Sequence, residues 1–574
     1  MPTEHFIAGK DASLEHSISA MQAKLAARGL AIEECSWLNP VDSVWSVHVR
    51  NRDCPLLFTN GKGASKLAAQ ASALGEFFER LSCNYFWNHY YLGNDIAHRD
   101  FAHYPRERWF PLADGGWPAD LLTPELQAFY NPQGSIPAAA LVDMNSGNGG
   151  RGICAIPYVR ERDGAEVFFP VNIISNLYVS NGMAAGNTRA EARAQALAEI
   201  LERHVKFKVI AEGLCLPDVP AEIVARTPGI AAGIAGLRAA GFGVLVKDAS
   251  LGGQYPVMCV TLLNPNDQGV FASFGAHPRR EIALERALTE LLQGRALEAL
   301  DGFPPPGFDR DEVASAPNIE IHFVDSSGIV AWDFLGEAPD FAFHDWNFST
   351  TTADDYAWLC RRIHADGHDI YVADFEHLGV YACRILVPGM SEIYPVDDLE
   401  WENNSVGNLV RPAILHLAEL DDDECGELLD ALNDHNLADE RPVAALIGLA
   451  PDPGSLWADL RVGELKTLLA LAIGDTDAVR EGCAWVRHFK QLDAGRRRVY
   501  DCIETLLALD NPDAYEAALV GLYGDATVDL ASDLIDGEVR FFGLASPGLD
   551  LQGCDLHRRL LAEYDKTHAR PLTA

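Results

Sequence analysis

The sequence lacks features that mark several broad classes of protein. None of its 12 cysteines forms a C-x-x-C pair, and 45 Lys and Arg residues stand against 83 Asp and Glu residues. The net charge of -38 repels nucleic-acid backbones, so we expect no direct binding to DNA or RNA. No apolar run reaches the roughly 18 residues that a membrane-spanning helix needs, so no membrane association is expected.

A targeting segment is not expected either. The opening residues, MPTEHFIAGKDASLEHS, contain neither a basic start nor an apolar stretch, which argues against a signal peptide. Scattered cysteines without pairs are typical of reduced thiols, so a cytoplasmic location is predicted. The 574 residues, 48% of them hydrophobic, can form three or four domain-sized units, or one large catalytic domain and a smaller one.

The first two thirds of the chain alternate between strand and helix patterns, which predicts a mixed α/β fold. The predicted strands cover residues 44–50, 56–61, 153–160, 167–172, 244–250, 256–264 and 369–375, with a hairpin turn at Asp163-Gly164. The predicted helices cover residues 65–85, 191–204, 280–300 and 356–367.

The pattern changes near residue 402. Beyond it the segments are rich in leucine and alanine, strand patterns vanish, and Asp, Gly and Pro turns separate helices. We therefore predict an α/β domain over residues 1–402 and an all-α, TPR-like interaction or dimerisation domain over residues 403–574. No clean repeat of about 34 residues is present, so the TPR resemblance is loose.

One predicted helix gathers acidic residues on a narrow stripe. Glu191, Gln195, Glu199 and Glu202 fall within an arc of about 80°. Each glutamate alone could belong to the solvated face. In addition, Thr188-x-x-Glu191 matches a capping box, which would give Glu191 a purely structural role.

Recurrence favours a functional role for these stripes. The predicted helix over 65–85 places Ser72, Glu76, Glu79 and Arg80 on one face, and the Glu-x-x-Glu-Arg spacing repeats at Glu199-x-x-Glu202-Arg203. The helix predicted over 280–300 carries Arg286, Glu290 and Gln293 on one stripe. Three helices of one α/β region therefore each combine acidic residues with an arginine.

If these faces converge, their charges need compensation. Two carboxylates about 5 to 6 Å apart repel by roughly 3 kcal/mol at an effective dielectric near 20. Either their pKa values rise or a divalent cation binds, and carboxylates on rigid helices suit Mg²⁺ with retained waters. Because Mg²⁺ held in this way usually bridges to phosphates, and arginine binds phosphate in a bidentate manner, a nucleoside triphosphate is the expected ligand.

Two glycine-rich segments precede these helices. TNGKGASK, residues 59–66, is not a P-loop, yet it could offer Lys62 or Lys66 to a phosphate at a helix N-terminus. A plain turn with Ser65 as the N-cap is an equally good interpretation. SNGMAAGNT, residues 180–188, places Asn187 close to Glu191.

The three linked motifs, in this order, resemble the ATP-binding signature of the YcaO family. The similarity includes the opening FIAGKDASLEHSI, the VPGMSEIYP stretch and the helical tail. The resemblance implies a nucleotide fold unrelated to P-loop enzymes. It assigns Mg²⁺ binding to Glu76, Glu79, Glu199, Glu202 and Glu290. It assigns nucleotide contacts to Lys10, Ser17, Ser72, Glu76, Glu79, Arg80, Asn187, Glu191, Gln195, Arg203 and Arg286.

The resemblance also implies chemistry and partners. Family members activate a peptide amide: a nearby nucleophile attacks the carbonyl carbon, and the oxygen takes the γ-phosphoryl group of ATP. Phosphate then leaves, giving an azoline or a thioamide. A methylthiotransferase or a ribosomal protein is the implied partner, and a homodimer is expected. The alternative is a non-catalytic, nucleotide-regulated scaffold for a methylthiotransferase.

Three other segments carry weaker signals. The family's peptide cyclodehydratases end in a P-x-P-x-P tail, whereas this sequence ends THARPLTA, which argues against azoline formation on a precursor peptide. GNGGRG, residues 147–152, leads into a strand and is interpreted as a hairpin turn, and HADGH, residues 364–368, as a helix end at Gly367. DDDEC, residues 421–425, is interpreted as an acidic helix start.

Overall fold

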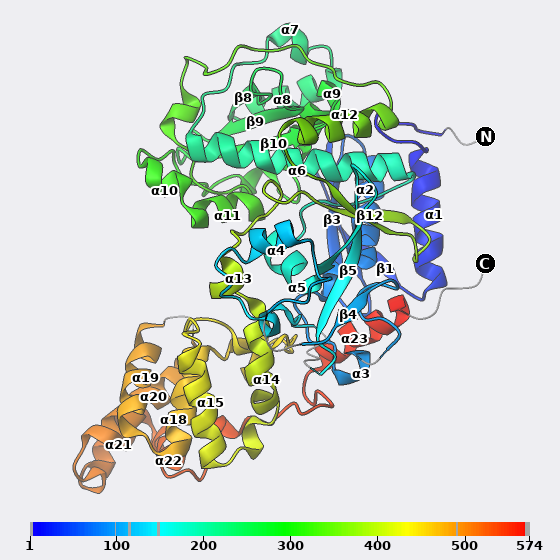
Figure 1. Ribbon diagram of the computed structural model, residues 1–574. Coiled ribbons are helices and arrows are strands. Elements are labelled where there is room, and N and C mark those ends of the chain that lie inside the picture. The colour runs from blue at the N-terminus through cyan, green and yellow to red at the C-terminus, as the bar shows by residue number, and fades with distance from the viewer. Residues whose placement is uncertain (1–3, 98, 113–115, 146–149, 490–491, 569–574) are drawn as a thin grey trace.

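The computed structural model in Figure 1 describes residues 4–97, 99–112, 116–145, 150–489 and 492–568. The strands are β1 (Ile32–Val41), β2 (Val44–Asn51), β3 (Phe58–Gly63), β4 (Arg108–Phe110), β5 (Ile153–Arg160), β6 (Glu166–Pro170), β7 (Met183–Gly186), β8 (Gly243–Asp248), β9 (Val257–Leu263), β10 (Val270–Ala276), β11 (Tyr371–Phe375) and β12 (Tyr381–Leu386). The helices of the first two thirds are α1 (Leu14–Ala27), α2 (Lys66–Ser82), α3 (Asn94–Ala97), α4 (Pro124–Tyr130), α5 (Val171–Ile173), α6 (Arg189–Glu212), α7 (Ala221–Val224), α8 (Pro228–Ala239), α9 (Arg280–Leu291), α10 (Arg310–Ala314), α11 (Ala316–Val324) and α12 (Thr352–Ala365).

The strands form three antiparallel sheets. The central sheet has the order β4-β5-β11-β12-β7, with β6 paired to β5, and the other two are the meanders β1-β2-β3 and β10-β9-β8. Each meander is preceded by a helix and followed by one, so α1-β1-β2-β3-α2 and α8-β8-β9-β10-α9 share one element order. The long helix α6 crosses between the central sheet and β10 (Figure 1). The expected mixed α/β class is confirmed.

Glycines bring three of these helices unusually close to a strand. A Cβ atom on Gly61 of β3 would lie 2.0 Å from the carbonyl oxygen of Ala69 in α2. A Cβ atom on Gly275 of β10 would lie 2.3 Å from the carbonyl oxygen of Ala283 in α9. On Gly186 of β7 it would lie 2.9 Å from the amide nitrogen at the start of α6. Each close approach fixes the height of a helix above its strand.

Several predicted boundaries were wrong for identifiable reasons. The helix predicted over 280–300 ends at Leu291, shortly before Gly294, whose φ is +70°. The Gly-Lys-Gly segment around Lys62 lies in β3 and is not a turn, although Ser65 is the N-cap of α2 as one interpretation held. β1, β4, β7, β10 and β12 were not predicted; β10 is buried at every residue and shows no alternation.

Other predictions were confirmed. β5 and β6 form the hairpin with Gly164 at a positive φ of +74°. The helix predicted over 356–367 is α12, which ends at Ala365 just before Gly367. GNGGRG lies partly, and the end of THARPLTA lies wholly, outside the described residues. Within the described part of the chain, no helix is both long and apolar enough to cross a bilayer.

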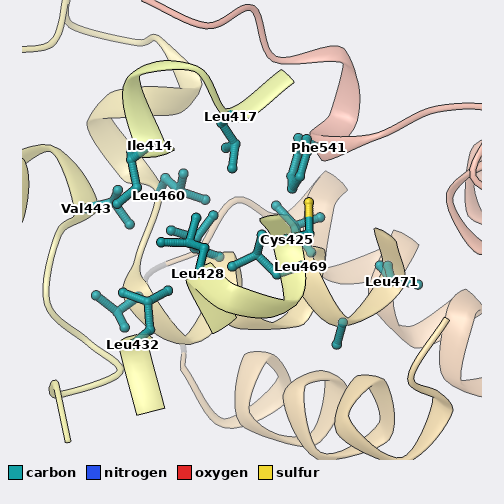
Figure 2. Packing of buried hydrophobic residues seen from close by; sticks show 14 of the residues in the cluster. Ile414, Leu417, Cys425, Leu428, Leu432, Val443, Leu460, Leu469, Leu471 and Phe541 are labelled. Carbon is teal, nitrogen blue, oxygen red and sulfur yellow. The ribbon is translucent and has the colours of Figure 1, made fainter. Parts of the chain in front are cut away.

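The described elements after residue 397 are all helical, as expected. They are α13 (Asp398–Trp401), α14 (Gly407–Leu415), α15 (Asp422–Asp434), α16 (Val443–Ile447), α17 (Leu456–Asp459), α18 (Val462–Ile473), α19 (Thr476–His488), α20 (Ala494–Ala508), α21 (Glu516–Tyr523), α22 (Asp525–Ile535) and α23 (Asp555–His568), with short 3-10 turns between them. Ile414, Leu428, Leu460 and Leu469 belong to one leucine-rich core (Figure 2). Asp421 caps α15 in a capping box with Glu424, which confirms the acidic helix start.

The last helix returns to the first part of the chain. The Tyr564 ring of α23 meets the Trp87 ring edge-on at 5.5 Å, and Trp87 Nε1 donates to the carbonyl of Leu560. Asn51 donates to the buried Glu563 carboxylate at 2.8 Å. The boundary near residue 402 therefore remains a prediction, since Leu556, Leu560 and Tyr564 of α23 join the core of β2 and α2. Leu561 of the same helix also packs against the core of the other late helices.

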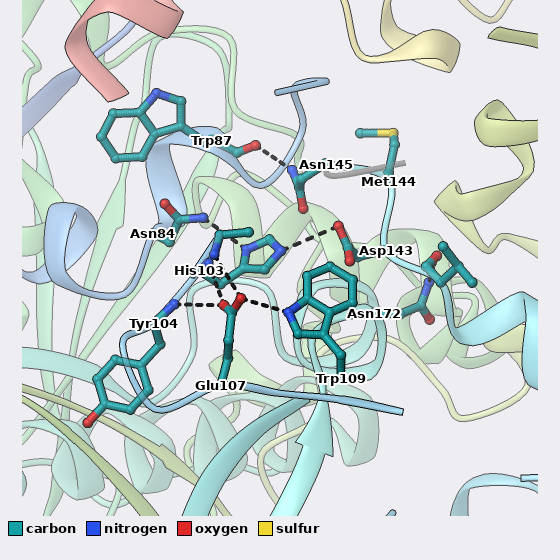
Figure 3. Close-up of polar contacts among 12 residues, drawn as sticks. Asn84, Trp87, His103, Tyr104, Glu107, Trp109, Asp143, Met144, Asn145 and Asn172 are labelled. Carbon is teal, nitrogen blue, oxygen red and sulfur yellow. Dashed lines mark hydrogen bonds and ion pairs between the residues drawn. The ribbon is translucent and has the colours of Figure 1, made fainter. Parts of the chain in front are cut away.

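A buried polar network surrounds Asp143 in the α/β part (Figure 3), and the helical side binds the same loop. His103 contacts Asp143 at 3.4 Å and Asn84 at 3.0 Å. From the helical side, Asn408 donates to the carbonyl of Asp143, and Arg411 donates to the carbonyl of the next residue. The loop that carries Asp143 is thus held from both sides, which couples α14 to the α/β part.

Candidate functional site

Helices α2, α6 and α9 converge on one cavity of about 630 Å³, which the N-terminal segment and α1 close on one side. Every residue to which the family resemblance assigned metal or nucleotide binding lines this cavity. They are Lys10, Ser17, Ser72, Glu76, Glu79, Arg80, Asn187, Glu191, Gln195, Glu199, Glu202, Arg203, Arg286 and Glu290. The three acidic faces therefore meet in space, whereas the individual roles of these residues remain predictions.

Helix α2 contributes an ion pair and a free carboxyl group. Its apolar face buries Leu74, Phe77 and Phe78, which turns Glu76 and Glu79 toward the cavity. Arg80 donates to one oxygen of Glu76 at 2.7 and 3.0 Å. Within the described residues Glu79 makes no hydrogen bond or ion pair, so its carboxyl group can take a ligand without losing a partner.

Helix α6 presents the second acidic face. Arg203 lies 3.0 Å from Glu199, one turn earlier on the helix. Glu202 accepts a hydrogen bond from the amide of Ala276 at the end of β10, at 2.9 Å. Lys206, one turn after Glu202, points away from the cavity and donates to Ser326 Oγ at 2.6 Å. A lysine four residues after Glu202 thus stabilises the packing of α6 on a neighbouring loop.

Helix α9 adds an arginine and the third acidic face. Arg286 donates to the carbonyl of Ala276 at 2.9 Å and to the side-chain oxygen of Gln195. Glu290 forms an ion pair with Lys62 of β3. Residues from four separate elements are thus linked across the cavity before any ligand is considered.

The N-terminal segment closes the cavity around Glu191. Lys10 Nζ lies 3.2 Å from this carboxylate, and the amide of Asp11 donates to it at 2.9 Å. Asn187 donates to Glu191 and accepts a hydrogen bond from Ser17. The capping box predicted at Thr188 is half formed, because Thr188 accepts from the amide of Glu191 while the Glu191 carboxylate serves the N-terminal segment.

Burial and mutual repulsion shift the pKa values in the cavity. Burial, together with the neighbouring Glu199, raises the pKa of Glu79 well above its usual value. Burial also raises the pKa of Glu199, although Arg203 opposes the shift. For Lys62, burial lowers the pKa to about 8 in spite of the glutamates around it. Bound cations would favour the ionised carboxylates, so the cavity gains from a divalent metal.

The residues fit Mg²⁺ with a nucleotide, yet the carboxylates are not already arranged around one point. In the part of the chain that the structure describes, no three His, Cys, Asp or Glu side chains are placed to hold a metal ion. Three of the five predicted metal ligands, Glu76, Glu199 and Glu290, are instead paired with Arg80, Arg203 and Lys62. A bound metal ion would thus have to replace these arginine and lysine side chains as the partner of the carboxylates.

The sequence did not single out some residues of the cavity wall. Glu285 precedes Arg286, and burial raises the pKa of its carboxyl group. His277 directly follows β10, and burial with the nearby Arg286 lowers its pKa to about 2, so it is neutral. A polar residue directly after a buried strand is a signal that could have found His277. Lys66, the alternative to Lys62, lies over the Trp37 ring at 4.6 Å and is not among the cavity residues.

Acidic helix faces that meet around a cavity with interspersed arginines define a candidate site for a metal-bound phosphate ligand. A family model described as YcaO cyclodehydratase, ATP- and Mg²⁺-binding, matches residues 60–391, and the C-terminal domain model of the same family matches residues 407–571. The chain belongs to the YcaO family, and ATP and Mg²⁺, the cofactors that the motifs predicted, are confirmed at the level of the family.

Known relatives extend over the whole chain. The sequence is 49% identical to the ribosomal protein S12 methylthiotransferase accessory factor YcaO of Escherichia coli, over 98% of both chains. It is 47% identical to an uncharacterised protein of Haemophilus influenzae, over 99% of this chain and 98% of the other. A structure of YcaO from Methanopyrus kandleri bound with AMPPCP and Mg²⁺ matches with a TM-score of 0.40 and 18% identity, over 66% of this chain and 91% of that one.

Proposed function

We propose that the protein binds ATP with Mg²⁺ in the cavity between α2, α6 and α9 and uses it to activate an amide by phosphoryl transfer. The observation that carries this proposal is the convergence of all the motif residues on one cavity of about 630 Å³. A pocket of this size suits a small-molecule cofactor. Its carboxylates favour a hard divalent cation, and its arginines favour phosphate.

The residues divide into three groups by their proposed roles. The metal would be held by Glu76, Glu79, Glu199, Glu202 and Glu290. Arg203 and Arg286 would bind phosphate oxygens, and Arg80 would hold Glu76 in place. The remaining contacts, at the end of the cavity where the N-terminal segment binds α6, would come from Lys10, Ser17, Ser72, Asn187, Glu191 and Gln195.

Bound Mg·ATP would supply a transferable phosphoryl group to an amide oxygen. The protein's part in such a reaction is positioning and charge neutralisation. The cavity is suited to both tasks, because its arginines are already held by Glu199 and Gln195. Helices pressed onto strands at Gly61 and Gly275 would keep these side chains rigid.

The acceptor and partner follow from the similarity to the Escherichia coli accessory factor. We infer that the protein assists β-methylthiolation of a ribosomal protein in the cytoplasm and contacts a methylthiotransferase or the ribosomal protein itself. The helical region would serve as a TPR-like contact or homodimer surface, since Trp401, Leu409 and Leu522 are large apolar side chains exposed there.

A second candidate is a nucleotide-regulated scaffold without turnover. Its support is that the 49% identical relative is described as an accessory factor to a methylthiotransferase. In this case the cavity would bind Mg·ATP and change the affinity for a partner. The polar network at Asp143 and Arg411 would connect the α/β part to the helical region.

Phosphate release from ATP distinguishes the two candidates. The wild-type protein is assayed alone, with a methylthiotransferase and with ribosomal protein S12, and binding of a non-hydrolysable ATP analogue is measured by calorimetry. If the protein is an enzyme, the rate of phosphate release should fall at least about 100-fold in Glu199→Ala. The matched control is Glu212→Ala on the same helix, outside the cavity and half-exposed beside Lys208. Analogue binding without turnover under every condition would support the scaffold.

A further inference from the structure

The placement of Lys62 suggests a role that the motifs do not assign. In β3 its neighbours Gly61 and Gly63 face α2, where an added Cβ atom would lie 2.0 Å and 2.7 Å from the nearest atoms of that helix. Because side chains alternate along a strand, Lys62 points away from α2 backbone and into the cavity. The close packing on both sides fixes the depth of its ammonium group.

Lys62 lies among the carboxylates predicted to hold the metal. It forms an ion pair with Glu290, and the charges of Glu76, Glu199 and Glu202 favour its protonated form against the cost of burial. Four of the five predicted metal ligands therefore act on one ammonium group. Among the described residues, no three acidic, histidine or cysteine side chains are arranged to hold a metal ion. In this arrangement the Lys62 ammonium group supplies positive charge to the carboxylates.

The metal and the lysine cannot both occupy this position. Mg²⁺ brings two charges to carboxylates that one ammonium group now neutralises, so Glu290 must release Lys62 when the metal binds. A released lysine still lies in a cavity that holds anionic phosphate, and a compact ammonium group is a common phosphate ligand. Exchange of partners keeps every charge in the half-buried cavity compensated.

We propose that Lys62 is a built-in counter-ion, which holds the metal-binding carboxylates before ligand arrives and transfers to the terminal phosphate when Mg·ATP binds. This inference rests on the proposed function, since it assumes that the cavity takes Mg·ATP. It makes Lys62 a positioning residue for the carboxylates in one state and a ligand contact in the other. The two roles predict effects of opposite sign for one substitution.

The test is Lys62→Met, measured by calorimetry and thermal unfolding with MgCl₂ alone and with Mg²⁺ plus either AMPPNP or ADP. Without the lysine, Mg²⁺ alone should bind at least tenfold more tightly than to wild type. The preference for AMPPNP over ADP should fall at least tenfold, because the contact to the terminal phosphate is lost. A lysine with a merely structural role would weaken all three ligands together or none of them.

Lys24→Met is the matched control. Lys24 lines the same cavity from α1 but forms no ion pair within the described residues, so its loss should leave Mg²⁺ binding without nucleotide unchanged. Should Lys62→Met bind Mg²⁺ alone no better than wild type and keep its preference for AMPPNP, the inference is overturned. If wild type binds no Mg·AMPPNP at all, the proposed function itself fails.

A measurement on the wild-type protein needs no variant. Acylation of Lys62 by acetic anhydride is followed by mass spectrometry without ligand, with MgCl₂ and with Mg·AMPPNP. We expect slow labelling at first, faster labelling with Mg²⁺ alone as Glu290 releases the amine, and protection when the nucleotide is added. Equal labelling in all three conditions contradicts the exchange even if Lys62→Met does not fold.

Discussion

The cavity and the helical region each contain a carboxyl group with a raised pKa, in different surroundings. Glu464 of α18 is fully buried, accepts a hydrogen bond from Tyr500 at 3.1 Å and lies 3.3 Å from Arg496. Burial raises its pKa to about 7. Glu79 of α2 also has a raised pKa, but it faces an open cavity and makes no ion pair or hydrogen bond within the described residues.

The difference shows why a shifted pKa alone does not identify a ligand site. Both shifts have burial as their first cause, so the direction of the shift is the same. At Glu464 the partners are side chains of α20 and the packing is closed. At Glu79 further carboxylates, two arginines and a cavity of about 630 Å³ surround the group. An open cavity beside partly neutralised charges, rather than the pKa shift itself, marks the candidate site.

The largest effect is expected from Gly61→Ala, which tests whether the cavity depends on close strand packing. The added Cβ atom would lie 2.0 Å from the oxygen of Ala69 and 2.4 Å from the nitrogen of Ala73. β3 must move off α2, and we expect a loss of at least about 3 kcal/mol in the free energy of unfolding, measured with urea. Gly426→Ala in α15 meets open space and should gain about 0.5 to 1 kcal/mol.

The next largest effect concerns the double variant Glu79→Gln, Glu199→Gln. Loss of two ionised ligands should weaken Mg·AMPPNP at least 100-fold, about 2.7 kcal/mol, in calorimetry. The ligand-free variant should unfold at a higher temperature than wild type at pH 8. A carboxyl group whose folded pKa is raised destabilises the fold progressively as pH rises above its unfolded pKa, and glutamine removes this cost.

Glu464→Gln is the matched control for the double variant, because it replaces a shifted carboxyl group outside the cavity. It should leave Mg·AMPPNP affinity unchanged. If the double variant and Glu464→Gln lost the same affinity for Mg·AMPPNP, the contrast between the cavity carboxylates and the buried Glu464 would be wrong.

Much of the site could be predicted from the sequence because its residues sit on helices with a regular period. The stripes of α2 and α6 follow from a spacing of three and four residues, and every residue on them that was singled out reached the cavity. Arg286 and Glu290 lie on α9 in the same way. A helix of this kind turns its charged face away from its apolar face whatever the rest of the fold does.

The rest depended on tertiary packing that periodicity does not contain. Lys62 reaches the cavity from β3 and His277 from the residue directly after β10, and β10 shows no alternation because both of its faces are buried. The return of α23 to Trp87 is a long-range contact between residues nearly 500 positions apart, and no local pattern encodes it. Ion pairs such as Lys62 with Glu290 likewise join elements that are distant in the chain.

Glu464→Gln should also change the pH dependence of stability. The folded pKa of about 7 lies above the usual glutamate pKa of 4.5, so between these pH values the folded protein keeps a proton that the unfolded chain has lost. The contribution of Glu464 to the free energy of unfolding of the wild type therefore falls by about 3 kcal/mol as pH rises from 4.5 to 7. Urea unfolding from pH 4.5 to 8 should show a shallower decline in the variant. Parallel curves would contradict the burial of Glu464.

The smallest effects are expected at the two helix starts that match the capping-box motif. Thr188-x-x-Glu191 opens α6 and Asp421-x-x-Glu424 opens α15, but only the second forms the reciprocal hydrogen bonds. Thr188→Ala and Asp421→Ala should each cost about 1 kcal/mol in unfolding free energy, because both side chains accept a hydrogen bond from a helix amide.

Substitution of the two glutamates should have different kinds of effect, one on stability and the other on ligand binding. Glu424→Ala removes half of a closed cap, so we expect a loss of at most about 1 kcal/mol in stability and no change in ligand binding. Glu191 instead binds Lys10 and the amide of Asp11, which hold the N-terminal segment over the cavity. Glu191→Ala should therefore weaken Mg·AMPPNP by about tenfold in calorimetry, and an unchanged affinity would show that α6 begins with an ordinary cap.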